Sequence, residues 1–300
     1  MSLEDFEEGY HGHLTSIVKT LSSAAQPEPP SLVELHKEFN RNPDDSDVTA
    51  QLALAHLKRK SNTNARKFAL QALKNGPHHQ LAGYVLARLY LSIGEARRAE
   101  AILTACLDEQ NRGADPPQKN AVALLAGLRL RAEDYAGAAR WYRLGRDHYP
   151  HDVKWLKALA GVYLKSDNQD RLAEALSELA ELDVDDLTIR KKLVQLALQR
   201  RDFSAAADWA NRAIHVDVMD AQLHAWLAEA CVGDKKLDRA TAEYEVAIEL
   251  APGNLAWRFA LADALVQAKQ TDRAREVLEE LLKINPEYPG ADILLESLQP

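Results

Sequence analysis

The feature that most constrains this fold is a leucine that recurs at a spacing of 34 residues, with a single step of 39. The seven leucines are Leu52, Leu86, Leu125, Leu159, Leu193, Leu227 and Leu261. Each is followed directly by Ala or Val, and another small or apolar residue, usually Ala, comes thirteen residues after it. A fixed period of this length is typical of a repeat array, in which each unit buries its apolar face only against its neighbours.

Within each period the apolar pattern predicts two amphipathic helices joined by a short polar turn. In the unit 119–152 we expect these helices at about 120–132 and 135–147. Proline ends several second helices, as in Tyr149-Pro150, because it has no amide donor and disfavours a helical residue before it. The small residue after each leucine lets the paired helices approach closely. The chain is therefore predicted to be all-α.

This pattern resembles the tetratricopeptide repeat over about 243 of the 300 residues, since the period, the leucine–small pair, the mid-unit alanine and the final proline all coincide. The resemblance implies a right-handed α-solenoid of antiparallel helix pairs. The family's aromatic residue near the start of the first helix is mostly missing, and its later tyrosine is present only as Tyr90 and Tyr163.

We expect four segments along the chain: an N-terminal helix and Pro-rich linker (1–30), a degenerate half repeat (31–45), seven repeat units (46–288) and a C-terminal capping helix (289–300). The cap is expected to cover the last unit with Ile293, Leu294 and Leu298, because an open stack needs a closed end. The 39-residue step comes from an insertion at 114–118. It is either a contact site or a tolerated insertion, and we favour the second.

Composition and charge limit the partners. The net charge is −8, and residues 203–300, with 9 basic and 17 acidic residues, carry that excess. Binding of nucleic acid is not expected, because phosphate contacts need a continuous basic surface. No signal-peptide pattern and no apolar stretch of about 18 residues is present, so membrane insertion is not expected and the compartment stays open. Cys106 and Cys231 lie at core-facing places and are predicted to act as small apolar residues.

Catalytic and metal-binding patterns are missing. The close histidine groupings are His11-Gly-His13, His78-His79 and the pair His148 and His151, and none has the helical spacing of a zinc site. Gly-rich phosphate loops and Gly-x-Ser-x-Gly are absent. The chain is therefore predicted to be no enzyme and to need no cofactor or metal.

The resemblance places a binding groove on the concave face, which the first helices line. The candidate residues for peptide binding there are Tyr84, Arg88, Arg131, Lys154, Lys157, Lys165, Lys191, Gln195 and Phe259. The basic middle of this set suits an extended peptide with carboxylates, although lysines that merely keep the wall hydrated are an equally good interpretation. The family's clamp for chaperone tails is not carried over, because Gly161 and Gln195 stand at its asparagine-type places.

The leading functional hypothesis is a noncatalytic scaffold that binds a protein or peptide, with acidic character, on its concave face. An alternative is the C-terminal partner-binding arm of a larger bacterial metallopeptidase-like enzyme whose catalytic domain is not in this chain. Its basis is the predicted helix 3–22 and the Pro-rich linker after it. Self-association is a third option, and it requires that the last helix leave Leu278 and Leu282 uncovered.

Overall fold

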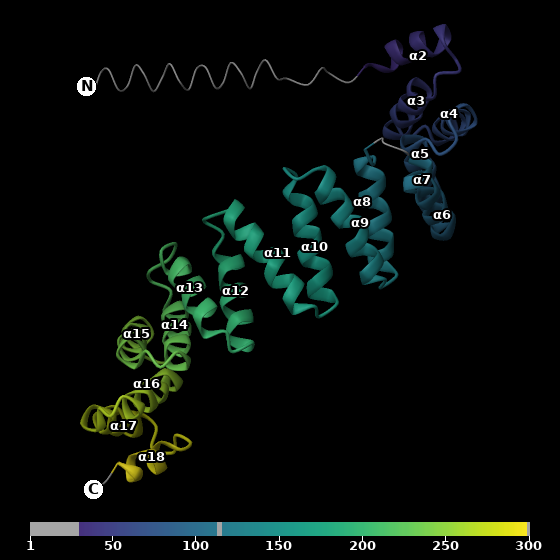
Figure 1. Cartoon of the computed structure of the whole chain (residues 1–300). Coiled ribbons are helices and arrows are strands. Elements are labelled where there is room, and N and C mark those ends of the chain that lie inside the picture. Colours follow the sequence, from purple (N-terminus) through teal and green to yellow (C-terminus); the bar gives the residue numbers. More distant parts are fainter. Residues whose placement is uncertain (1–29, 113–115, 299–300) are drawn as a thin grey trace, which may run out of the picture. The chain divides into compact units, whose positions relative to one another are not determined.

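Helices are the regular elements of the described part of the chain, which comprises residues 30–112 and 116–298 of a computed structural model (Figure 1). The prediction of an all-α fold is therefore confirmed. The helix expected at 3–22 and residues Ala114 and Asp115 of the insertion lie outside the described residues. The chain divides into two units, 1–121 and 122–300, which are described in turn.

The structure describes the N-terminal unit from residue 30 onward, beginning with helix α2. Its helices are α2 (Leu32–Arg41), α3 (Ser46–Lys58), α4 (Asn62–Asn75), α5 (Gln80–Ser92), α6 (Ala96–Leu107) and α7 (Glu109–Arg112). Ser31 begins α2 with a capping box, in which its hydroxyl accepts from the Glu34 amide and the Glu34 carboxylate accepts from the Ser31 amide. Leu35 is buried against α3 and α4, with Leu32 and Phe39 beside it, so α2 covers the first pair.

The C-terminal unit is a series of helix pairs in chain order. It contains most of α8 (Lys119–Arg131), which begins in the N-terminal unit. Its further helices are α9 (Tyr135–His148), α10 (Val153–Lys165), α11 (Gln169–Leu182), α12 (Leu187–Gln199), α13 (Phe203–Ile214), α14 (Ala221–Gly233), α15 (Leu237–Leu250), α16 (Leu255–Gln267), α17 (Thr271–Ile284) and α18 (Ala291–Ser297). From α9 to α18 each helix packs against the next (Figure 1). None of the helices described in either unit is both long and apolar enough to cross a membrane.

The recurring leucines form the centre of each pair. All seven have between 0% and 4% of their surface exposed, and the small residue after each has at most 8%. Burying a leucine is worth about 1.5–3 kcal/mol, and the adjacent small residue lets the partner helix come close enough to exclude water. The period in the sequence is thus the period of the core.

Each turn inside a pair uses a left-handed residue at the same place. That residue has a φ of 51° to 61° at six positions, and it is a glycine, Gly94 with a φ of 81°, at the seventh. The six are Lys60, Glu133, Asp167, Arg201, Lys235 and Lys269. The polar residue after the left-handed one often caps the next helix, since Asp134, Asn168 and Asp202 each accept a backbone amide at the start of the second helix.

The start of most first helices is fixed by an acidic cap. Asp152, Asp186 and Asp220 stand 34 residues apart, and each carboxylate accepts a backbone N–H within the first turn of α10, α12 or α14. A negative group here also interacts favourably with the positive end of the helix dipole. The repeated cap therefore sets the same starting point for each of these helices.

Second helices of the C-terminal unit are also joined by ion pairs. Arg146 of α9 reaches Glu178 of α11 at 3.2 Å, and Arg212 of α13 reaches Glu181 of α11 at 2.6 Å. Further along, Arg273 of α17 pairs with Glu245 of α15. These side chains are roughly half exposed, so each pair contributes little, about 0–1 kcal/mol.

The final helix covers the last pair, with one correction to the expected contacts. Leu294 and Leu298 pack on the cluster of Leu278 and Leu281 as expected. Ile293, which was also expected there, is 69% exposed, and Leu295 takes its place in the cluster. Because α18 begins at Ala291, its buried stripe is 291, 294, 295 and 298, and residue 293 falls outside it.

The end of the insertion is tied to the second pair. The side-chain amide of Gln80 donates to the carbonyl of Pro116 at 3.3 Å, and its oxygen accepts the Gln118 amide at 2.5 Å. Pro117 is buried. The Gln118 side chain in turn accepts the amide of Ala121 at 2.6 Å, so this stretch serves as the cap of α8.

Candidate functional site

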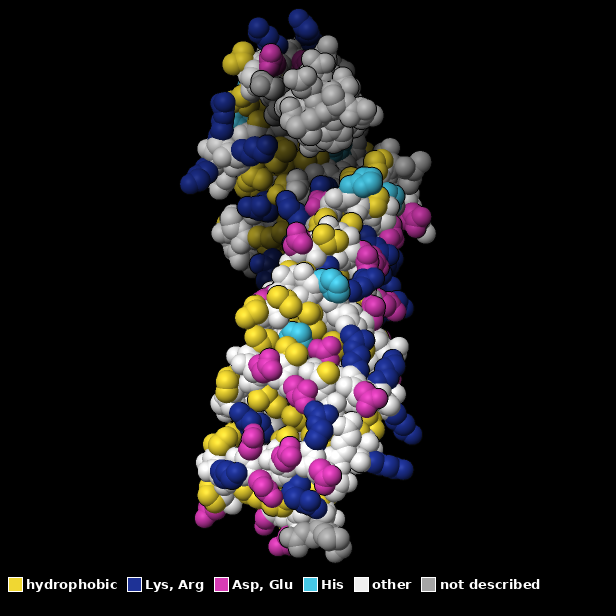
Figure 2. Space-filling model, turned by 90° about the vertical axis from the view of Figure 1, so that its left-hand side faces the viewer, with side chains coloured by type: hydrophobic (Ala, Val, Ile, Leu, Met, Phe, Trp, Pro, Cys, Tyr) yellow, Lys and Arg dark blue, Asp and Glu magenta, His cyan; other side chains and the backbone are white. Residues whose placement is uncertain are grey.

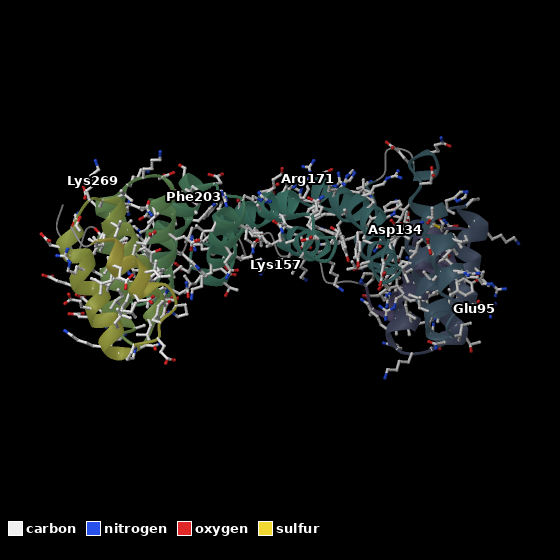
Figure 3. The ribbon with its side chains drawn as sticks, turned by 90° about the horizontal axis from the view of Figure 1, so that it is seen from below. Glu95, Asp134, Lys157, Arg171, Phe203 and Lys269 are labelled. Atoms are coloured by element: carbon white, nitrogen blue, oxygen red, sulfur yellow. The ribbon has the colours of Figure 1, made fainter. Side chains whose placement is uncertain are left out.

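The lysines of α10 form an exposed basic stripe. Lys154, Lys157 and Lys165 lie at a helical spacing on α10, the first helix of the fourth repeat, and all three are exposed. No ion pair within the described ranges involves any of them. In Figure 3, Lys157 lies on one side of the ribbon of the C-terminal unit and Arg171 on the other. The ion pairs between the second helices therefore do not neutralise the charge of this stripe.

A gap in the side-chain surface lies within the stripe. Gly161 is exposed in the middle of α10, and a Cβ built on it meets no atom within 4 Å. The helix backbone is therefore accessible between Lys157 and Lys165. An extended peptide could approach the helix more closely here than at any place where a side chain stands.

Lys191, another candidate, is committed to the protein itself. Its ammonium pairs with the carboxylate of Asp220, which also caps α14 by accepting the Gln222 amide at 3.1 Å. The side chain of Asp220 is only 13% exposed, so this pair is better shielded than the surface pairs. Lys191 is thus not an unpaired cation for a ligand, and its neighbour Gln195, half buried on α12, carries no charge.

Arg131 and Phe259 lie elsewhere in the C-terminal unit, on α8 and α16. Arg131 is exposed at the last position of α8, and its charge slightly opposes the rise that burial causes in the pKa of Tyr142. The Phe259 ring lies 5.5 Å from that of Tyr288, among the residues that α18 covers. Phe259 therefore holds the C-terminal cap, and only part of its ring is exposed.

Tyr84 and Arg88 form a pair in the N-terminal unit. Both are on α5, one helical turn apart, and the Arg88 guanidinium donates to the Tyr84 hydroxyl at 3.2 Å. Arg88 is exposed and Tyr84 is half buried. The pair offers a cation and a hydroxyl at one place on this first helix.

Three histidines make contacts that serve the fold. His79 caps α5 and lies 2.9 Å from Asp47. Buried His224 contacts the Glu243 carboxylate at 2.7 Å and the Val218 carbonyl at 3.0 Å. His56 is buried and stacks on Phe68 at 5.3 Å, and burial lowers its pKa. No group of three or more metal-binding side chains is found among the described residues.

The cysteines are unsuited to nucleophilic chemistry. Cys106 and Cys231 are buried and unbridged. Burial raises the pKa of the Cys106 thiol to about 11 and raises that of Cys231 as well. A reactive cysteine needs the opposite shift, because the thiolate is the nucleophile. Both behave as small apolar residues in their helices.

One surface escaped the reasoning from sequence. Between α4 and α5 of the N-terminal unit lies a groove of about 450 Å³, which Leu70, Leu86, Leu89, Tyr90 and Ile93 line with apolar atoms. Arg66 and Lys67 stand at its rim. A signal was available: between Asp47 and Glu95 the chain contains seven Lys or Arg and no Asp or Glu. We refer to this surface below as the α4–α5 groove.

Comparison with known proteins identifies the repeats. Family models described as tetratricopeptide repeat match residues 191–254 and 232–298. No curated protein sequence matches the chain.

Among solved structures, that of MamA protein is 21% identical and covers 55% of this chain and 90% of its own, with a TM-score of 0.45. A chain of the Naa15/Naa10 complex bound to HypK-THB is 17% identical, covers 90% of this chain and 41% of its own, and has a TM-score of 0.50. The structure of pilF from Pseudomonas aeruginosa is 17% identical and covers 75% and 99%, with a TM-score of 0.41. At these identities the likeness concerns the fold alone.

The matched models cover the last helix pairs, and the same leucine, left-handed turn and helix pair recur back to residue 46. Residues 191–298 are therefore tetratricopeptide repeats, and the helix pairs before them follow the same pattern.

Proposed function

We propose that this protein is a noncatalytic scaffold that binds an acidic segment of a partner protein on the basic stripe of α10. Tetratricopeptide repeats are protein-interaction modules, and the chain is accordingly a protein-interaction scaffold. The single observation that carries the finer proposal is that Lys154, Lys157 and Lys165 are exposed on one helix and have no acidic partner of their own in the described ranges.

Energetics support a peptide that makes several contacts at once. An exposed ion pair contributes about 0–1 kcal/mol, so a single carboxylate would bind too weakly to be specific. Three lysines along one helix can meet carboxylates on successive turns of an extended chain, and the exposed backbone at Gly161 lets that chain lie close to the helix.

Charge reversal at two of the lysines tests the proposal. In Lys154→Glu/Lys157→Glu, attraction of a carboxylate is replaced by repulsion, so the capture of partner proteins from native lysate should fall about tenfold or more. The matched control is Arg171→Glu, on the opposite side of the ribbon (Figure 3), where capture should not change.

The readout is affinity capture with quantitative mass spectrometry of the retained proteins. Proteins lost with the double variant should be enriched in acidic segments, and their binding should weaken at high salt because exposed charges are screened. Equal capture by the wild type and the double variant would show that the α10 stripe is not the binding surface.

A further inference from the structure

The α4–α5 groove has the features of a second binding site. Its volume of about 450 Å³ lies in the range of ligand pockets, roughly 300–1,000 Å³. Leu86 and Leu89 form a buried floor, with 2% and 9% of their surface exposed. Leu70 and Ile93, at the opening, are 47% and 67% exposed. Exposing apolar side chains of this size to water costs free energy, so their exposure does not stabilise the fold.

The repeats themselves show that the fold does not require these two residues. The other units have polar residues at the place of Leu70, namely Thr104, Arg143, Ser177, Asn211, Glu245 and Glu279. At the place of Ile93 they have Arg59, Ala132, Ser166, Arg200, Asp234 and Ala268, none of which is a bulky apolar residue. Since the same helix pair forms with either set, the apolar pair in this one groove calls for another explanation.

The equivalent groove between α11 and α12 gives a direct comparison. Its floor keeps Leu193 and Leu196 at the places of Leu86 and Leu89. Its opening is different, because Arg200 lies where Ile93 stands and reaches Asp170 at 3.0 Å across the groove. In the α4–α5 groove no ion pair spans the opening in the described part of the chain. The apolar floor there is accessible.

The charge around the α4–α5 groove selects the kind of partner. Arg66 and Lys67 are exposed at the rim, and no acidic residue lines the groove. Figure 2 shows dark blue side chains gathered around yellow ones in the upper part of the molecule, the region of α2 to α6. A basic rim around an apolar hollow complements a peptide whose bulky apolar side chain has carboxylates on either side.

We propose that the α4–α5 groove binds an acidic segment of a partner protein, in which one bulky apolar side chain enters the hollow and flanking Asp or Glu residues meet Arg66 and Lys67. A nucleic acid would make no use of the exposed Leu70 and Ile93. A membrane surface would require apolar side chains that protrude along a helix face, whereas here they line a hollow.

The test uses the whole chain and a synthetic probe, the fluorescein-labelled peptide Asp-Glu-Asp-Phe-Asp-Glu-Asp. Fluorescence anisotropy should show saturable binding that weakens as salt is raised. Replacing the central Phe of the peptide by Ala, or its carboxylates by amides, should each weaken binding about tenfold or more. Absence of binding, or binding that depends on neither feature, overturns the proposal.

Variants then locate the site. Leu70→Ser/Ile93→Arg copies the residues of the α11–α12 groove and should weaken peptide binding about tenfold or more, whereas the conservative Leu70→Met should keep it. Arg66→Glu/Lys67→Glu should also abolish the salt dependence. Because all these positions are exposed, the far-ultraviolet circular dichroism and the melting temperature should remain those of the wild type.

Two further measurements separate this site from other possibilities. Lys154→Glu/Lys157→Glu should leave binding of the probe unchanged; a loss with this variant instead assigns the peptide to the α10 stripe and overturns the groove proposal. If light scattering shows a dimer that Leu70→Ser/Ile93→Arg dissociates, the occupant is a second copy. If Phe6→Ala alone tightens binding of the probe, the occupant is this chain's own acidic segment Glu4–Glu8. Either outcome overturns the assignment to a partner protein.

Discussion

Two glycines of the C-terminal unit should respond to the same substitution with opposite sign. Alanine is about 0.8–1.0 kcal/mol more favourable than glycine inside a helix. At Gly161 a new methyl group meets no atom within 4 Å, so Gly161→Ala should raise the free energy of unfolding by nearly this whole amount.

At Gly145 the surroundings reverse the result. A Cβ there would lie 2.5 Å from the Trp155 ring, which is 3% exposed and lies between Tyr142 and Tyr149, each at 6.3 Å between ring centroids. The ring cannot move without displacing these neighbours. Overpacking of this kind costs about 1–3 kcal/mol. After the gain in helix propensity is subtracted, Gly145→Ala should lower the free energy of unfolding by up to about 2 kcal/mol.

Urea unfolding, followed by circular dichroism and by tryptophan fluorescence, measures both variants. The two free energies of unfolding should differ by about 1–3 kcal/mol. The fluorescence of native Gly145→Ala should also change, because Trp155 must shift. If both variants move stability in the same direction, the close contact of α9 with Trp155 is not what requires a glycine there.

Three other substitutions test the turn, the buried histidine and the core. Gly94→Ala should lower the free energy of unfolding by about 1–2 kcal/mol, because its φ of 81° is left-handed and its Cβ would meet no atom within 4 Å, so backbone strain alone acts; equal stability of wild type and variant in urea would contradict this. Burial, with smaller contributions from the charges of His36 and Arg59, lowers the pKa of His56 below its usual 6.5, so the unfolded chain binds the proton more readily and stability should fall as the pH drops below about 6.5. In His56→Phe this part of the pH dependence should vanish from melting curves, and an unchanged dependence would rule His56 out. Leu159→Ala, at a residue 1% exposed, should cost about 2–5 kcal/mol, and a loss below about 1 kcal/mol would show that the recurring leucines are not the centre of the pairs.

Period and residue size were enough to predict the helix pairs. Because every unit packs only on its neighbours, a leucine at a fixed interval must be buried at a fixed interval, and all seven are. The helices expected at 120–132 and 135–147 lie at Lys119–Arg131 and Tyr135–His148. Local periodicity determines such elements, and no contact with a distant residue is needed to predict them.

Contacts between neighbouring repeats could not be predicted in the same way. Lys191 fits the pattern of an exposed basic place, but only the packed structure brings it against Asp220 at the start of α14. Phe259 likewise depends on where α18 and Tyr288 lie. The α4–α5 groove was missed because its exposed leucine and isoleucine have meaning only when compared with the same places of the other repeats.

The regular acidic caps have a consequence for how such a protein can change in length. Cutting after Asp186 and rejoining at Ala221 leaves an aspartate directly before a first helix, as at Asp152 and Asp220. A gene segment that encodes one such stretch can therefore be lost or duplicated without creating a foreign junction. The number of repeats that follow the α10 stripe can vary in this way, while the stripe keeps its own side chains.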